Sequence, residues 1–232
     1  MDEIVSGFFQ AIQLIFSFDP ALYEIISLSL RVSGTALAIS IVIGVPIGAA
    51  LGLSRVRARG FITALLYTGM GLPPVVVGLF VYLMLSRSGP FGVLGWLFSP
   101  SAMVVAQVII AFPLVAGLTM TAVQGVDASL RLQVRSLGAT RWQETWAVLR
   151  EARIGVVAAI VAAFGSIVSE VGAVMLVGGN IDGKTRVLTT AIVLNTRTGE
   201  FAAAIALGLI LLALAFIANV AMLQLQRRTG DL

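Results

Sequence analysis

Five long apolar runs constrain the fold of this chain more than any other feature. They cover approximately residues 32–53, 61–85, 102–123, 154–177 and 201–225, and each is long enough to cross a bilayer as a helix. In lipid, backbone polar groups must bond within their own segment, which favours helices. Charged residues make up 11% of the chain, whereas a soluble domain has about 25%. We therefore expect an all-α, polytopic membrane helix bundle with five long spans.

A shorter apolar segment, residues 1–18, precedes the first run. It starts with Asp2 and Glu3 in place of basic residues, and no small-x-small cleavage pattern follows, so it does not read as a secretory signal peptide. A polar stripe at helical spacing is formed by Ser6, Gln10, Gln13 and Ser17. A helix of about 15 residues reaches roughly 22 Å, less than a hydrocarbon core of about 30 Å. We expect a short N-terminal helix along the interface or against the bundle, with a sixth span as the alternative.

Basic residues in the connections predict the orientation. Ten lie in the first connection, the third connection and the C-terminal tail: Arg55, Arg57, Arg59, Arg131, Arg135, Arg141, Arg150, Arg153, Arg227 and Arg228. The second and fourth connections together hold four: Arg87, Lys184, Arg186 and Arg197. Because short cytoplasmic loops carry an excess of basic residues, we place the first group in the cytoplasm and the second group outside.

The stretch GGNIDGKT, residues 178–185, matches the phosphate-loop pattern G-x-x-x-x-G-K-[ST]. A phosphate loop needs a strand before it and a helix after it, so that backbone N–H groups converge on the phosphates. This stretch instead leaves a predicted membrane helix on the outer side. The alternative is an exposed turn in which Gly178, Gly179 and Gly183 permit positive φ. We favour the turn.

The third connection, residues 124–153, is long, polar, compatible with helix and interrupted by Gly138. A connection of this length is uncommon unless it has a function. Trp142 and Trp146 are four residues apart and share one helical face. A short helix with such a face could dock in a groove on a soluble partner. The alternative from periodicity is a helix that lies on the membrane with its aromatic side chains at the headgroups.

The sequence SLGATRWQ resembles the L-G-A core of the EAA loop in permease subunits of binding-protein-dependent ABC importers. Four further blocks, in the same order along the chain, resemble the molybdate, sulfate and tungstate permeases as a group. They are residues 28–48, 72–79, 169–192 and 199–212. The run SEVGAVMLVGGNIDGKTRVLTTAI is most similar to the tungstate type. Two positions depart from the family pattern, since Arg131 stands where the family has a glutamate and the proline that often follows the coupling helix is replaced near Glu151.

This resemblance implies a bundle of the MetI-like ABC permease type, in which residues 1–232 form a single transmembrane permease domain and residues 124–153 form a cytoplasmic coupling loop. It implies a homodimer in the cytoplasmic (inner) cell membrane, with two ABC ATPase subunits below and an extracytoplasmic oxyanion-binding protein above. The chain itself would hold no cofactor, because ATP would be bound by the partner subunit. The residues that would engage the ATPase are Ser136, Leu137, Gly138, Ala139, Thr140, Arg141, Trp142 and Gln143. Transport of tungstate, or alternatively molybdate or sulfate, would proceed by alternating access.

Residues of the translocation path or its gate are expected at Pro73, Pro74, Ser169, Glu170 and Gly172. Prolines bend helices in ways that a rocking bundle could use, although they are also common in membrane helices. At the outer loop, Gly179, Lys184 and Arg186 are expected to meet the binding protein or draw the anion in.

Glu170 is the only carboxylate inside a predicted long span, and intramembrane charges usually face a cavity or a partner. It could pair with Arg31, or be protonated and bonded to Ser166 or a backbone group. Direct binding of an oxyanion is disfavoured because a carboxylate repels it. A structural or gating role is therefore expected.

Two other classes of function are tested by the sequence. A proton-coupled secondary transporter that uses Glu170 would show an inverted repeat, and we find none. The chain has no histidine and no cysteine, so it lacks the residues that a membrane enzyme, a thiol enzyme or a zinc site would need. Nucleic acid is not expected as a partner, since the arginines lie in short loops between apolar runs.

Overall fold

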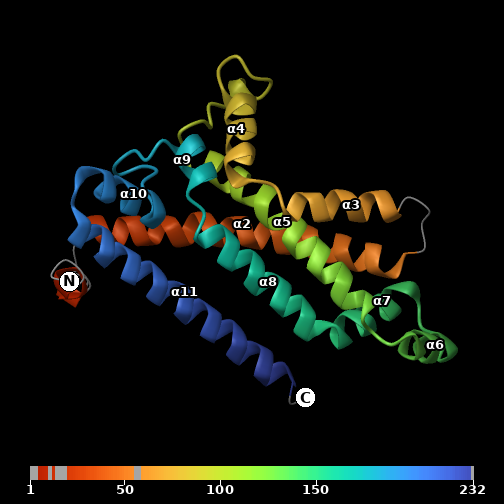
Figure 1. The fold of residues 1–232 in the computed structure, drawn as a ribbon. Coiled ribbons are helices and arrows are strands. Elements are labelled where there is room, and N and C mark those ends of the chain that lie inside the picture. Colours follow the sequence, from red (N-terminus) through yellow and green to blue (C-terminus); the bar gives the residue numbers. More distant parts are fainter. Residues whose placement is uncertain (1–4, 10–11, 14–19, 55–58, 231–232) are drawn as a thin grey trace. The chain divides into compact units, whose positions relative to one another are not determined.

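The computed structural model describes residues 5–9, 12–13, 20–54 and 59–230, and these residues contain helices and turns but no strand (Figure 1). The helices of four or more turns in the apolar runs are α2 (Pro20–Leu53), α5 (Pro100–Gln124), α8 (Arg153–Val168) and α11 (Phe201–Gly230). Shorter elements are α3 (Arg59–Met70), α4 (Pro74–Leu85), η1 (Gly92–Leu94), α6 (Ala128–Ser136), α7 (Arg141–Glu151), α9 (Gly172–Gly178) and α10 (Leu188–Thr198). The prediction of an all-α fold is confirmed.

Three of the five predicted spans are continuous helices. Within the described residues, α2, α5 and the first 21 residues of α11 are each long and apolar enough to cross a membrane. The second predicted span, residues 61–85, is wrong as a single helix because it breaks into α3 and α4. Pro73 is extended (φ −61°, ψ 122°) and Pro74 opens α4, since the residue before a proline is disfavoured in the helical region. This pair counts as one span only as a broken helix, as does the pair α7 and α8.

The fourth predicted span, residues 154–177, is also wrong as a single helix. The helix α8 ends at Val168, and α9 begins at Gly172. The fourth connection also contains a helix that the sequence reading did not predict, α10.

The N-terminal segment is described only in part. Residues 5–9 are helical, and Gly7 lies so close to Ile205 of α11 that an added Cβ would be 2.6 Å from its Cγ2 atom. This contact agrees with a helix against the bundle. Two of the four residues of the predicted polar stripe, Gln10 and Ser17, lie outside the described residues.

The chain divides into two compact units. The first comprises Met1–Thr35, Pro73–Gln107 and Ile167–Ala221, and the second comprises Ala36–Leu72, Val108–Ser166 and Met222–Leu232. The first unit contains the second and fourth connections, which the basic residues place outside. The second unit contains the first and third connections and the C-terminal segment, which the same rule places in the cytoplasm.

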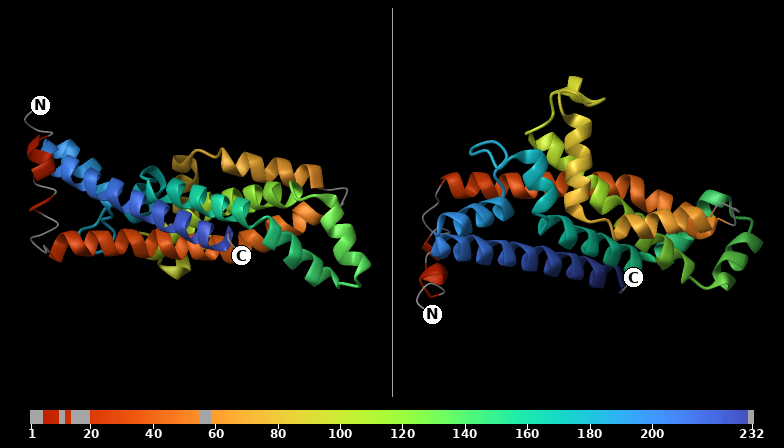
Figure 2. Two further views of the ribbon diagram at one scale, coloured as in Figure 1. Left: turned by 90° about the horizontal axis from the view of Figure 1, so that it is seen from below. Right: turned by 45° about the horizontal axis from the view of Figure 1, so that its top comes forward.

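In the first unit, α4 lies beside α9 (Figure 1). Gly78 makes this approach possible, because a Cβ added there would lie 2.6 Å from the Cα atom of Ala173. The unexpected helix α10 packs its buried residues Leu188 and Ala191 against Leu207 of α11, next to the N-terminal part of α2 (Figure 2).

In the second unit, a row of glycines brings α2 against α5. Gly44, Gly48 and Gly52 are four residues apart and therefore share one helical face, and added Cβ atoms at all three would clash with α5. Small residues at this spacing let membrane helices approach closely. A core cluster that includes Ala49, Val123 and Val148 continues this contact down to α7.

Candidate functional site

The 124–153 loop folds as two short helices, α6 and α7, joined by a tight turn. The Oδ1 atom of Asp127 accepts from the backbone N–H of Ser129 (2.7 Å) and caps α6. This bond, with a side-chain bond from the same serine, holds the pKa of the Asp127 carboxyl below its ordinary value. Gly138 makes the turn at φ 80°, a conformation that glycine adopts without strain. Gly138, which interrupts the loop in the sequence, therefore makes the turn between the two helices.

The start of α7 is fixed by a reciprocal pair of hydrogen bonds. The Thr140 hydroxyl accepts from the backbone N–H of Gln143 (3.3 Å), and the Gln143 amide oxygen accepts from the backbone N–H of Thr140 (2.8 Å). Such a capping box satisfies two helix-end donors at once. The sequence ATRWQ therefore determines where α7 begins.

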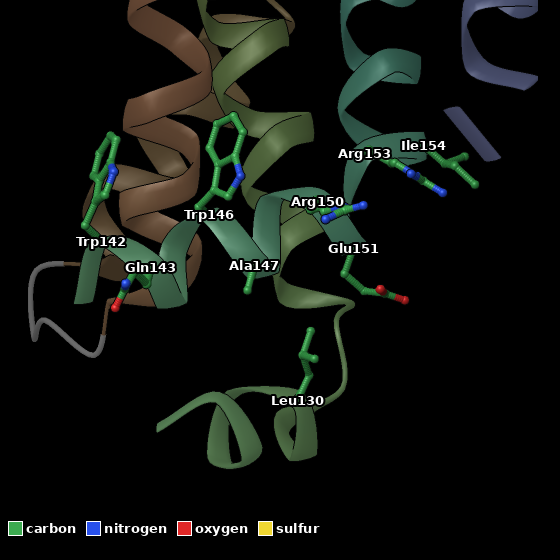
Figure 3. A pocket seen from close by; sticks show the side chains of 9 residues that line it. All are labelled: Leu130, Trp142, Gln143, Trp146, Ala147, Arg150, Glu151, Arg153 and Ile154. Carbon is green, nitrogen blue, oxygen red and sulfur yellow. The ribbon is translucent and has the colours of Figure 1, made fainter. Parts of the chain in front are cut away.

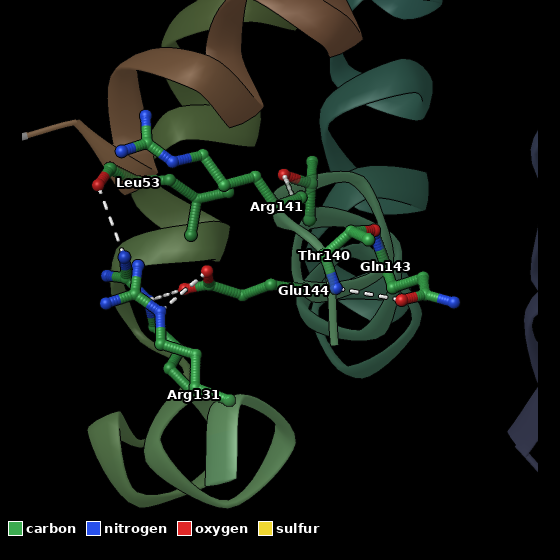
Figure 4. Close-up of polar contacts among 8 residues, drawn as sticks. Leu53, Arg131, Thr140, Arg141, Gln143 and Glu144 are labelled. Atoms are coloured by element: carbon green, nitrogen blue, oxygen red, sulfur yellow. Dashed lines mark hydrogen bonds and ion pairs between the residues drawn. The ribbon is translucent and has the colours of Figure 1, made fainter. Parts of the chain in front are cut away.

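A buried carboxylate ties the two helices together (Figure 4). Glu144 is 4% exposed, and its two oxygens accept from the Nε atoms of Arg131 (3.0 Å) and Arg135 (2.8 Å) on α6. The Nη2 atom of Arg131 also donates to the carbonyl of Leu53 at the end of α2 (3.3 Å). The bond from Arg135, followed by that from Arg131, lowers the pKa of Glu144 below its ordinary value of 4.5, although burial opposes the shift. Charged hydrogen bonds therefore lock the loop to itself and to α2.

This network gives a structural account of Arg131, which departs from the glutamate of the family pattern. The carboxylate stands on α7 instead, at Glu144, and Arg131 is its partner. The sequence reading missed Glu144, although its position four residues after the cap at Thr140 places it one turn into α7.

The opposite side of α7 carries a pair of exposed aromatic side chains. Trp142 and Trp146 are 77% and 65% exposed and lie side by side along α7, as their spacing predicts (Figure 3). They line a cavity of about 860 Å³ with Arg150, Glu151 and Ile154 among its walls. Exposed tryptophans beside a basic side chain are typical of the anchors of protein interfaces.

The predicted gate residues meet in the first unit. Pro73 and Pro74 open α4, and Gly172 opens α9 at a point where an added Cβ would lie 2.6 Å from Val75 of α4. Ser169 and Glu170 lie in the break before α9. The structure therefore brings the five residues to neighbouring helix ends.

The expectation that Glu170 lies inside a continuous span is wrong. Its Oε1 atom accepts from the backbone N–H of Ala173 (2.9 Å), so the carboxylate caps the start of α9. Its carbonyl accepts from the Thr189 hydroxyl of α10 (3.1 Å). Of the two alternatives for Glu170, the pair with Arg31 is wrong, because the ion pairs among the described residues join Glu144 to Arg131 and Arg135, and Asp182 to Arg186. The other alternative, a bond to a backbone group, is the one observed.

A small polar cavity beside Glu170 was not predicted. It has a volume of about 10 Å³ and is lined by Ser33, Gln107 and Thr189 among others. Gln107 is 4% exposed and donates to the carbonyl of Ile167 (3.0 Å), while its own Oε1 atom is buried without a protein partner. The signal in the sequence was available, since Gln107 is an amide inside the third apolar run.

The outer loop is a turn closed by its own side chains. Gly179 and Gly183 have positive φ (74° and 64°). Thr185 is fully buried and donates to the carbonyl of Gly178 (2.6 Å). The segment follows α9 and is separated from the start of α10, so it lacks the strand–loop–helix arrangement of a phosphate loop. The prediction of a turn is confirmed at Gly179 and Gly183, but it is wrong for Gly178, which is the buried last residue of α9 and does not have a positive φ.

Of the two basic residues of this loop, one forms an ion pair and the other is exposed. Arg186 donates to Asp182 (2.7 Å), whereas Lys184 is exposed. Lys184 is therefore the better placed of the two for contact with a passing anion or a partner.

Comparison with known proteins adds the family. The model of the family described as "binding-protein-dependent transport system inner membrane component" matches residues 44–231. The chain belongs to this family. It is thus a transport component of the ABC permease type, and the resemblance seen in SLGATRWQ is confirmed.

The permease has close relatives over nearly its whole length. It is 41% identical to the tungstate uptake system permease protein TupB of Peptoclostridium acidaminophilum, over 97% of this chain and 99% of the relative. It is 45% identical to a probable anion ABC transporter permease protein of Haloferax volcanii, over 85% and 88% of the two chains. The molybdenum transport system permease protein ModB of Escherichia coli (strain K12) is 32% identical over 84% and 89%.

Solved structures confirm the predicted bundle type. A chain of the MetNI methionine ABC transporter in an inward facing conformation has a TM-score of 0.75 and 19% identity, covering 93% of this permease and 97% of that chain. An amino acid ABC transporter has a TM-score of 0.62 and 18% identity, with 94% and 97% covered. At these identities the likeness concerns the fold alone.

Proposed function

We propose that this permease forms the translocation path of an ATP-driven importer for a tetrahedral oxyanion, and that the anion is tungstate. The observation that carries the choice of anion is the 41% identity to a tungstate uptake permease across almost the entire length of both chains. Molybdate is the second candidate, on the strength of the 32% identity to the Escherichia coli molybdenum permease.

ATP is bound and hydrolysed on a partner subunit in this proposal, and this chain holds no cofactor. The part of the chain that would meet the ATPase is the turn from Ser136 to Gln143 with the first turns of α7. Its geometry suits that role, because Trp142 and Trp146 offer an exposed aromatic face and Glu144 keeps α7 rigidly attached to α6 and α2. Closure of two ATPases would then move the α6–α7 hairpin together with the end of α2 and reorient the spans.

The complete importer would contain a second copy of this chain and an extracytoplasmic oxyanion-binding protein, in the cytoplasmic (inner) cell membrane. The binding protein would dock on the side that carries the second and fourth connections. Gly179 and Lys184 lie in the fourth connection.

Lys184 offers the cleaner test of the outer loop. The change Lys184→Glu leaves the Arg186–Asp182 pair intact, whereas Arg186→Glu removes it. If both reversals leave uptake unchanged at low salt, where electrostatic attraction is least screened, the loop has no part in drawing in the anion.

The break at Ser169–Val171 and the start of α4 at Pro73 and Pro74 would supply the gate. Breaks in membrane helices are places where two rigid segments can change their relative angle. Glu170 would act there by holding the first turn of α9, and the anion would be passed without touching the carboxylate.

One experiment tests the whole proposal. The permease is reconstituted in vesicles with its ATPase and binding protein, and uptake of tungstate, molybdate and sulfate is measured with and without ATP. We expect ATP-dependent uptake with tungstate preferred. Uptake driven by a pH gradient without ATP would overturn the proposal in favour of a proton-coupled transporter, and a preference for molybdate would overturn the choice of anion alone.

A further inference from the structure

A basic pocket lies on the side of α7 that faces away from the two tryptophans. Its volume is about 620 Å³, and it is lined by the end of α2, by α6 and by the start of α7. Three arginines, Arg131, Arg135 and Arg141, contribute to its walls together with a single acid, Glu144. The lining side chains therefore carry an excess of positive charge.

The hydrogen bonds of these arginines leave donors available. Glu144 accepts from the Nε atoms of Arg131 and Arg135, so the Nη groups of Arg135 are not used by the carboxylate. Arg141 takes part in none of the ion pairs among the described residues. The Arg131 side chain reaches the Leu53 carbonyl from α6, and the Arg141 side chain extends from α7 along Leu53 (Figure 4). Guanidinium forks in this arrangement fit the oxygens of a phosphate group.

An exposed apolar face of α2 leads to the same pocket. At 100° per residue, Ile39, Ile43, Ala50 and Leu53 fall on one face of the helix. Ile39 and Ile43 are 37% and 45% exposed, and Ala50 and Leu53 line the pocket itself. The opposite face of α2 is occupied, since its glycines pack against α5. An apolar track thus ends in a cluster of arginines, at the end of a helix long enough to span the bilayer.

We propose that this pocket binds an anionic phospholipid, with the headgroup phosphate on Arg135 and Arg141 and an acyl chain along Ile39 and Ile43 of α2. Basic pockets at the cytoplasmic ends of membrane helices attract anionic headgroups. A bound lipid would stabilise the contact between α2 and the α6–α7 hairpin. The site is independent of which anion the permease transports, and its occupancy can be measured without transport.

The test is lipid retention by the purified full-length chain. Native mass spectrometry compares phosphatidylglycerol with phosphatidylcholine on the wild type and on Arg141→Gln, which leaves both bonds to Glu144 in place. We expect preferential retention of phosphatidylglycerol by the wild type and a loss of about 5-fold in affinity for each arginine removed, from the usual contribution of a basic residue near an anionic surface. Arg141→Lys keeps the charge but not the fork, and should restore part of the preference.

The control is Arg31→Gln, which removes an exposed arginine from the other half of α2 and should leave the preference unchanged. Equal retention by wild type and Arg141→Gln overturns the proposal. Displacement of phosphatidylglycerol by inorganic phosphate would show that the arginines take free oxyanions, and would overturn the lipid as the source. Arg141 also belongs to the turn that is proposed to meet the ATPase, so the measurement is repeated with the ATPase bound. Loss of the preference in that state would show that the ATPase covers the pocket, and would overturn a lipid site in the assembled importer.

Discussion

The bonds of Glu144 predict the effect of one substitution on the α6–α7 hairpin. Glu144→Gln keeps the shape of the side chain but removes the charge that accepts from Arg131 and Arg135. A hydrogen bond to a charged group contributes about 1.5–3 kcal/mol when it is shielded from water, and an exposed ion pair contributes about 0–1 kcal/mol. Arg135 makes the shorter bond and lowers the pKa of Glu144 more, but its side chain is 56% exposed against 28% for Arg131. Because water screens an exposed ion pair, we assign most of the effect on stability to Arg131.

The expected loss is about 2 kcal/mol, which corresponds to roughly a 30-fold shift in the equilibrium between docked and open hairpin. Hydrogen–deuterium exchange of the α7 amides in the purified chain measures this shift directly, because local opening sets the exchange rate. The matched control is Glu151→Gln, on the same helix but exposed and without an ion pair among the described residues. If the two variants exchange at the same rate, the carboxylate does not hold the hairpin and the argument is refuted.

The pH dependence of the same hairpin has a definite sign. The pKa of Glu144 is lowered in the folded chain by its arginine bonds. Its contribution to stability is therefore complete above the ordinary value of 4.5 and is lost as the pH falls through the lower folded value. Protection of α7 in the wild type should stay constant from neutral pH down to about the ordinary value of 4.5 and fall between that value and the lower folded one, while Glu144→Gln should show no such step.

Substitutions at three further places test the other sites. Changing Trp142 and Trp146 to alanine should leave thermal stability within about 0.5 kcal/mol of the wild type, because both side chains are exposed. The same change should abolish co-purification with the ATPase and ATP-driven uptake. Normal uptake by the variant would contradict the proposed docking face. Gly78→Ala should cost about 1–3 kcal/mol in a thermal unfolding assay, because its Cβ would clash with the backbone of α9. The control Gly165→Ala has open space around the added Cβ and should be tolerated. Equal melting temperatures for the two variants would show that α4 and α9 separate easily. Glu170→Gln retains an acceptor for the cap of α9 and should preserve assembly and uptake. Glu170→Leu should lower the stability by about 1 kcal/mol and abolish transport. Wild-type transport by the leucine variant would remove any special role for this residue.

The family pattern carried more of the candidate site than residue chemistry did. SLGATRWQ predicted the position of the coupling turn, and Gly138 and the Thr140–Gln143 cap bear out its local geometry. These features are local, since each bond joins residues only a few positions apart, and local bonds can be read from a sequence. The engagement of the ATPase by this turn stays a prediction.

The partners of the charged residues could not be read in this way. Arg131 bonds to Glu144, 13 residues away, and to Leu53, 78 residues away. For Glu170 the sequence left a pair with Arg31, at a comparable predicted depth, and a bond to a backbone group both open, and the backbone N–H of Ala173 is the partner observed. Depth along a helix does not determine which way a side chain faces.

The sequence by itself determined that the chain is an all-α membrane protein with five long apolar runs, and that the 124–153 loop turns at Gly138, because hydropathy over about 20 residues and the residues at helix ends act locally. Only the tertiary structure decided which of these runs are continuous, that the fourth run breaks between α8 and α9, that α10 forms in the fourth connection, and that Arg131 joins Glu144 of the 124–153 loop to the end of α2. The break in the second run, by contrast, follows from Pro73 and Pro74 in the sequence. Apolar composition fixes that a segment is buried in lipid, but a break in a helix is stable only when neighbouring groups satisfy its freed backbone atoms, and those groups come from elsewhere in the chain.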